Sequence, residues 1–115
     1  RLVELLRECT AAAGFSAAVG KQWTTDAPFR EMLSQIETYQ AQGVLGVDME
    51  TSAMYALGRF RGVSCCNLLV VSDEMWQEWN PGFGLPVLKA GMQTGGRIVV
   101  AAAQKLAQEL FTRPD

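Results

Sequence analysis

The spacing of apolar residues along the chain predicts four helices. Apolar side chains recur every three or four positions, the period of one helix face, in four stretches of the sequence. The first stretch runs from Leu2 to a stop at Gly14, and the others cover residues 30–42, 50–61 and 87–111. Three glycines in the first half of the last stretch each cost about 1 kcal/mol against alanine in a helix, so we expect a kink or a close packing contact there. They are Gly91, Gly95 and Gly96.

Between the helices lie three short apolar runs that predict buried strands. They cover residues 15–19, 44–49 and 63–71, and the last is the clearest because it is the longest. Residues 21–29 and 74–86 predict loops, and loops as long as the second are usually functional or disordered. About three strands alternating with four helices favour an α/β fold, a layered sheet with helices on both faces.

Composition narrows the class of protein. The chain has 115 residues, of which 49% are hydrophobic and 19% charged, an ordinary globular balance. A formal charge of −2 and a pI of about 5.1 offer no basic field to nucleic acid or to an anionic membrane. No apolar run approaches the ~18–20 residues of a membrane span. With no histidine and no CxxC spacing, we expect no metal site and a reduced, cytoplasmic protein.

Two carboxylates, Asp48 and Glu50, flank Met49 where the second predicted strand gives way to a helix. Ligands in open α/β sheets bind beyond the carboxyl ends of strands, and the start of a helix favours a negative charge. An ionised carboxylate accepts two hydrogen bonds at once, which suits vicinal hydroxyls such as those of ribose. The alternative is that Asp48 caps the helix and Glu50 only favours its first turn.

Two further segments follow predicted strands. The third apolar run ends at Ser72 and Asp73, where a partly buried aspartate suits proton donation to a leaving group; a turn or cap aspartate is the alternative. After the first strand, Trp23 and Phe29 suit stacking on a planar base, or else they pack on the core while Asp26 organises the turn. The position of all three segments at the ends of consecutive strands favours a shared site.

These segments together resemble the purine nucleoside phosphorylase/uridine phosphorylase superfamily. Its members carry a Glu-Met-Glu or similar segment, here Asp-Met-Glu-Thr-Ser-Ala from Asp48, and many purine-acting members carry a Ser-Asp pair at the spacing of Ser72 and Asp73. The loop Trp-Thr-Thr-Asp-Ala-Pro-Phe-Arg-Glu resembles the base-site loop of one branch. The resemblance covers residues 15–110. The matching stretch lacks the Gln-x-Arg pair of the uridine-specific branch, which favours a purine-like base.

The resemblance implies a sugar-binding role for the first motif. Glu50 would bind the ribose hydroxyls, and Met49 would pack against the sugar. Asp48 stands where the family often has the longer glutamate, so its direct contact with the ligand stays open.

The resemblance implies a base-binding role for the other two segments. Asp73 would protonate a purine nitrogen as the glycosidic bond breaks, with Ser72 supporting it, and Phe29 would stack on the base. The implied reaction passes through an oxocarbenium-like sugar that phosphate or water attacks at the anomeric carbon. General acid catalysis of this kind is worth ~10²–10⁴-fold.

The same resemblance implies that residues 1–115 are the C-terminal half of a larger phosphorylase-like domain. The chain starts at Arg1 in a helical pattern, and no Gly-x-Gly-x-x-Gly anion loop precedes Arg30. Family members carry their phosphate loop in an N-terminal half, so the fragment alone is expected to be a poor catalyst. No cofactor is expected beyond inorganic phosphate as co-substrate.

Several functions stay open at this point. Beside phosphorolysis stand hydrolysis, a catalytically silent nucleoside-binding module, and an interaction domain that docks through Trp76 and Trp79. The expected partners are a small-molecule nucleoside and, by the resemblance, further copies of the protein in a homo-oligomer.

Overall fold

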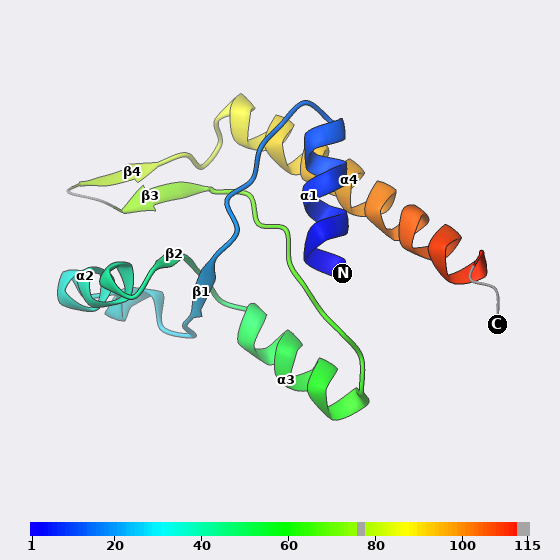
Figure 1. Cartoon of the computed structure of the whole chain (residues 1–115). Helices are drawn as coiled ribbons and strands as arrows, with labels where there is room; N and C mark the ends of the chain where they lie inside the picture. The colour runs from blue at the N-terminus through cyan, green and yellow to red at the C-terminus, as the bar shows by residue number, and fades with distance from the viewer. Residues whose placement is uncertain (76–77, 113–115) are drawn as a thin grey trace. The chain divides into compact units, whose positions relative to one another are not determined.

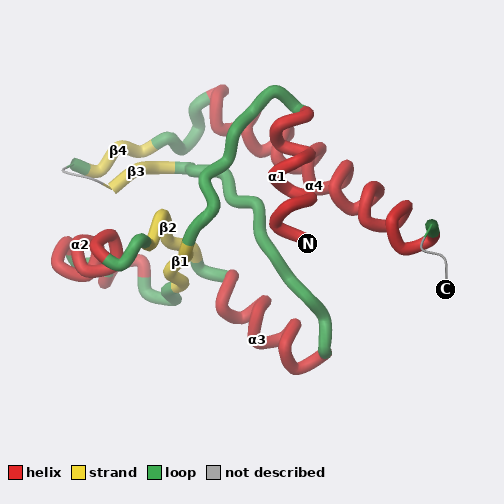
Figure 2. Tube along the Cα trace, viewed as in Figure 1, coloured by secondary structure: helices red, strands yellow, loops and turns green. Residues whose placement is uncertain are grey.

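The computed structural model describes residues 1–75 and 78–112, and Figures 1 and 2 show their helices and strands. The chain divides into two compact units. The terminal unit joins Arg1–Ala17 to the segment from Asn67 onward, and the central unit covers Ala18–Cys66. Across these described ranges, each unit holds one two-stranded sheet and two α-helices. The α/β class predicted from the sequence is confirmed, with its strands in two small sheets.

In the central unit, β1 (Lys21–Thr24) and β2 (Val44–Asp48) pair in parallel. Parallel strands need a crossover connection, which the short helix η1 (Pro28–Arg30) and α2 (Leu33–Ala41) supply. The pairing sets Thr24 opposite Asp48, so both strands end at the same edge.

Helix α3 (Thr51–Arg61) follows β2 almost at once. It ends at Gly62, whose φ of 66° lies in the left-handed region that glycine adopts without steric cost. The short connection between β2 and α3 therefore brings the Asp-Met-Glu segment to the carboxyl edge of the sheet.

In the terminal unit, α1 (Leu2–Ala12) packs along α4 (Pro86–Phe111) (Figure 1). Their contact buries Leu5, Ile98 and Ala102. The four ion-pairing side chains between these helices are Arg1, Glu8, Lys105 and Glu109.

The sheet of this unit pairs β3 (Asp73–Met75) with β4 (Trp79–Pro81) in antiparallel fashion. Helix α4 is continuous through its glycines. A Cβ on Gly91 or on Gly95 would come within 3.2 Å of Val70, so the predicted close packing contact is confirmed.

The four predicted helices and the strand at 44–49 are confirmed, with boundaries that shift by a few residues. The strand predicted at 15–19 is wrong, because β1 lies at Lys21–Thr24 inside a predicted loop. The residues of β1 are largely polar, and their pairing with β2 rather than their hydrophobicity makes them a strand.

The strand predicted at 63–71 is also wrong, as the segment has no regular secondary structure. A strand forms only where its backbone pairs with a neighbour, and no described strand pairs with this segment. Its apolar side chains include the exposed Val63 and Val71. The loop predicted at 74–86 instead overlaps β3, which begins one residue earlier, and contains β4. None of the helices in the described part of the chain has the length and apolarity needed to cross a membrane.

Candidate functional site

The carboxyl ends of β1 and β2 are joined by hydrogen bonds. The Thr25 amide donates to the Asp48 carbonyl at 2.9 Å, and the Thr24 hydroxyl donates to Asp48 Oδ1 at 2.7 Å. The structure therefore brings the end of β1 and the Asp-Met-Glu segment together, as predicted for two of the three sequence segments.

Asp48 has protein donors on both carboxylate oxygens. Besides the Thr24 hydroxyl, Oδ1 accepts a long bond of 3.4 Å from the Thr51 amide, and Oδ2 accepts from the Thr51 hydroxyl. The Thr24 hydroxyl in turn accepts from the Ser52 amide at 3.1 Å. These contacts support the structural alternative for Asp48, in which it ties both strand ends to the start of α3.

Glu50 is the residue that precedes the first turn of α3. Its side chain is exposed, and Oε2 accepts a hydrogen bond from the Met49 amide at 3.2 Å. A carboxylate at a helix N-terminus is favoured by the helix dipole, and an exposed one has lone pairs within reach of a ligand's hydroxyls. Met49 is half exposed beside it. The predicted position of both residues at the strand-to-helix junction is confirmed.

The two aromatic residues predicted to stack on a base differ in their surroundings. Trp23 is half-buried on β1, and its ring centroid lies 4.7 Å from that of Tyr39 in a tilted arrangement. Such an aromatic pair stabilises packing, so Trp23 follows the core-packing alternative. Phe29 on η1 is 99% exposed, so the same alternative is wrong for Phe29.

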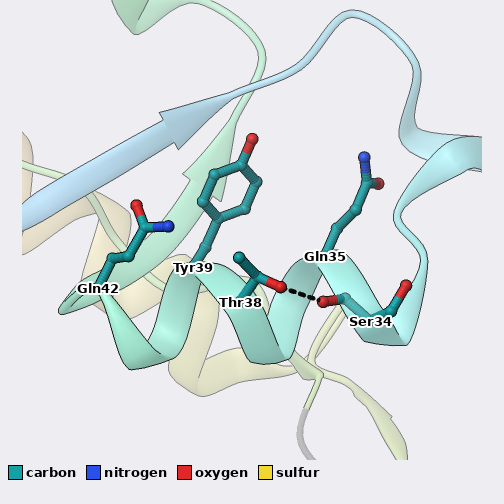
Figure 3. A pocket seen from close by; sticks show the side chains of 5 residues that line it. All are labelled: Ser34, Gln35, Thr38, Tyr39 and Gln42. Atoms are coloured by element: carbon teal, nitrogen blue, oxygen red, sulfur yellow. Dashed lines mark hydrogen bonds between the residues drawn. The ribbon is translucent and has the colours of Figure 1, made fainter.

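A polar hollow of about 420 Å³ lies beside α2. Its lining side chains come from this one helix and from Gln42 directly after it, and they rise from one side of the helix (Figure 3). The Thr38 hydroxyl donates to the Ser34 carbonyl at 2.7 Å, which satisfies it within the helix. With walls from a single element, the hollow is a surface depression rather than an enclosed ligand site.

Ser72 and Asp73 belong to the terminal unit, and Asp73 begins β3 rather than ending a strand. The Ser72 hydroxyl donates to Asp73 Oδ1 at 2.6 Å, and the Trp79 indole N–H donates to Asp73 Oδ2 at 2.9 Å. Ser72 and Asp73 are partly buried. The structure therefore joins Ser72 and Asp73 by a direct hydrogen bond, and the supporting role of Ser72 in catalysis stays a prediction.

Trp79 was not predicted as part of this cluster. The sequence predicts a loop at Trp79, with a docking surface as its role and a lid or subunit contact as the alternative. The antiparallel pairing that brings Trp79 to Asp73 has no apolar alternation from which it could be predicted. Its partner in that docking prediction, Trp76, lies outside the described residues.

Gly82, directly after β4, contacts the backbone of Ser72 beside the Ser72, Asp73 and Trp79 side chains. Its amide donates to the Ser72 carbonyl at 2.9 Å, and a Cβ at this position would overlap that carbonyl oxygen. Only glycine allows the backbone to approach so closely, so the position of Ser72 depends on it.

An apolar hollow of about 620 Å³ lies in the terminal unit. Leu68, Val70 and Ser72 line it from the segment before β3, and Met92 and Val99 line it from α4. The hydroxyl that supports Asp73 thus belongs to a residue at the wall of an apolar space.

The cysteines do not form a metal site or a disulfide. All three are free, and burial, followed by the neighbouring Cys65, raises the pKa of the Cys66 thiol. A protonated thiol behaves as a small apolar group. No cluster of three or more histidine, cysteine, aspartate or glutamate side chains within residues 1–75 and 78–112 is placed to hold a metal ion.

Comparison with known proteins gives a family match. The profile of the phosphorylase superfamily matches residues 1–107, which confirms the resemblance found in the motifs. DeoD-type purine nucleoside phosphorylases of Bacillus cereus (strain ZK / E33L), Bacillus thuringiensis (strain Al Hakam) and Bacillus mycoides (strain KBAB4) are each 36% identical over 63 residues. The match covers 55% of this chain and 27% of each relative. No solved structure gives a significant match.

Proposed function

The chain belongs to the phosphorylase superfamily, and on this premise we propose that the protein cleaves purine nucleosides by phosphorolysis to a free base and ribose 1-phosphate. The observation that carries the proposal is the hydrogen bond from the Ser72 hydroxyl to the Asp73 carboxylate, since Ser72 itself lines an apolar hollow. The Bacillus relatives are named purine nucleoside phosphorylases. The motifs of this chain are the reason for proposing the same class of base and the same reaction here.

The sugar is proposed to bind at the start of α3. Glu50 would accept hydrogen bonds from the 2′ and 3′ hydroxyls of ribose, since its carboxylate is exposed and carries two acceptor oxygens. Met49, half exposed next to it, would cover the apolar face of the sugar. Asp48 would act indirectly, by fixing the strand-to-helix junction from which both side chains project.

The base is proposed to leave with a proton from Asp73. As the glycosidic bond breaks, its electron pair passes to the purine ring, the Asp73 carboxylic acid transfers its proton to a ring nitrogen, and a phosphate oxygen bonds to the anomeric carbon. The Ser72 hydroxyl then donates to the carboxylate that remains. Phe29, fully exposed on η1, is the proposed stacking partner of the base.

The remaining part of the machinery is proposed to lie beyond this chain. The segment that matches this chain is 27% of the length of the relatives. No glycine-rich anion loop occurs in the first 30 residues of this chain. We propose, from the motif resemblance, that residues 1–115 are the C-terminal part of a phosphorylase-like domain that works as a homo-oligomer. Inorganic phosphate would be its co-substrate.

Product analysis of the full-length protein tests the proposal. Inosine with inorganic phosphate should give hypoxanthine and ribose 1-phosphate, and uridine should react far more slowly. Release of free ribose at a rate independent of phosphate would identify a nucleosidase instead. Nucleoside binding by calorimetry without any turnover would identify a silent binding module.

A further inference from the structure

The Asp73 carboxylate accepts hydrogen bonds from two side chains, and only one of them belongs to the Ser-Asp motif. Ser72 donates to Oδ1, and the indole N–H of Trp79 donates to Oδ2 at 2.9 Å. Because the two donors occupy different oxygens, they fix the rotation of the carboxyl plane as well as its position. A hydrogen bond to a charged acceptor is worth more than one between neutral groups.

The β3–β4 pairing explains how Trp79 reaches Asp73. Met75 lies opposite Trp79, and Asp73 lies opposite Pro81. Residues two apart on a strand share one face of the sheet, so Trp79 and Asp73 are diagonal neighbours on that face, within reach of a large aromatic side chain. The contact is therefore a product of strand register.

The indole of Trp79 can only donate in this hydrogen bond, which determines which form of Asp73 the contact favours. The indole Nε1–H donates and never accepts, so it cannot take part in the proton transfer itself. It interacts best with the carboxylate that forms when Asp73 gives up its proton. An interaction that strengthens as the proton leaves lowers the activation barrier rather than tightening substrate binding.

We propose that Trp79 is a positioning residue for proton donation by Asp73, which it orients and whose carboxylate product it stabilises. The inference rests on the proposed purine nucleoside cleavage and adds to it a residue from outside the motif.

The test replaces Trp79 by phenylalanine in the full-length protein. Trp79→Phe keeps an aromatic side chain on β4 and removes the N–H. We expect kcat for inosine to fall roughly 10-fold, the lower end for loss of a hydrogen bond to a charged group because Trp79 is 59% exposed. KM for inosine should stay unchanged. Turnover of 7-methylguanosine should also stay unchanged, because its purine ring is already cationic and needs no proton.

A matched control changes the next residue of the same strand. Asn80 lies opposite Glu74 on β4, and Asn80→Ala perturbs the strand pair without touching the indole. Its kinetics should equal those of the parent. A parallel fall in kcat for Asn80→Ala would overturn the inference, since the loss would then follow from disturbing the strands.

A spectroscopic signature tests the contact apart from catalysis. In ¹⁵N-labelled protein, Asp73→Asn should shift the indole resonance that Trp79→Phe removes, and an unmoved resonance would overturn the inference. A rise in KM with kcat intact would mean that Trp79 binds substrate, which also overturns it. If Asp73→Asn slows inosine cleavage while Trp79→Phe does not, the inference fails and the proposed function stands. If the protein cleaves no purine nucleoside, both fail.

Discussion

Replacing Asp48 by alanine should destabilise the central unit. The substitution removes the acceptor for the Thr24 hydroxyl at 2.7 Å and for the hydroxyl and amide of Thr51. Loss of a side-chain acceptor at the start of a helix costs about 1 kcal/mol, and loss of a hydrogen bond to a charged group costs about 1.5–3 kcal/mol. Because Asp48 is only partly buried, we expect a total of about 2–4 kcal/mol.

Urea unfolding of the full-length protein measures this loss as a lower midpoint at constant slope. Thr24→Val preserves the branched shape of the side chain and removes its hydroxyl, which both donates to Asp48 and accepts from the Ser52 amide. The double variant should lose less free energy of unfolding than the sum of the two single variants, with a coupling energy of about 1 kcal/mol for residues that share a hydrogen bond.

The opposite pattern would refute this reasoning about Asp48. If Asp48→Ala unfolds at the urea midpoint of the parent but raises KM for nucleosides, the carboxylate contacts the ligand and its contacts within the fold contribute little. Additive effects of the Asp48 and Thr24 substitutions would likewise show that the 2.7 Å contact carries no energy in solution.

Three further predictions follow from the same structure. Glu50→Ala should leave the urea midpoint nearly unchanged, because the side chain is exposed, yet weaken nucleoside use much more than free-base binding; equal losses in calorimetry would exclude a ribose role. Asp73→Asn should slow inosine cleavage by roughly 10²–10⁴-fold and spare 7-methylguanosine, and equal slowing of both would exclude proton donation. Hydrogen bonds from Lys105 and then Arg1 lower the pKa of Glu8 below its ordinary value of 4.5, so its contribution to stability is present above that pH and is lost as pH falls through the lowered value. The melting-temperature gap between the parent and Glu8→Gln should therefore close in acid, and a constant gap would contradict the ion pair.

The sequence predicts helices well here because their signal is local. The periodicity behind α1 and α4 places Leu5 and Ile98 on faces that meet, and both are buried. The strand-to-helix junction at Asp48 was predictable for the same reason, since β2 and α3 are adjacent in the chain and each carries its own pattern.

The strands outside this junction were not predictable because pairing is not local. The polar residues of β1 form a strand through their register with β2, whereas the apolar segment 63–71 has no paired neighbour among the described strands. An apolar run predicts that a segment is buried, but it does not predict whether the backbone of that segment pairs with a neighbouring strand. The contact between Trp79 and Asp73 was missed for the same reason, as it depends on the β3–β4 register.

The three carboxylates in the motifs look alike in the sequence, but they differ in the hydrogen bonds that each accepts within the fold. Asp48 gives both oxygens to donors on β1 and α3, so a ligand hydroxyl would have to displace contacts that hold the strand end to the helix. Glu50, two residues later, is exposed and takes one bond from the adjacent backbone, so vicinal hydroxyls can approach it without such a loss. Asp73 also has both oxygens occupied, but its donors are the adjacent Ser72 and Trp79 on the paired strand, so its contacts do not tie a strand end to a helix. The donors on each carboxylate, rather than the motif letters, therefore distinguish Asp48, which links a strand end to a helix, from the accessible Glu50 and from Asp73 in the β3–β4 segment. The proposed structural, sugar-binding and acid roles are based on this difference.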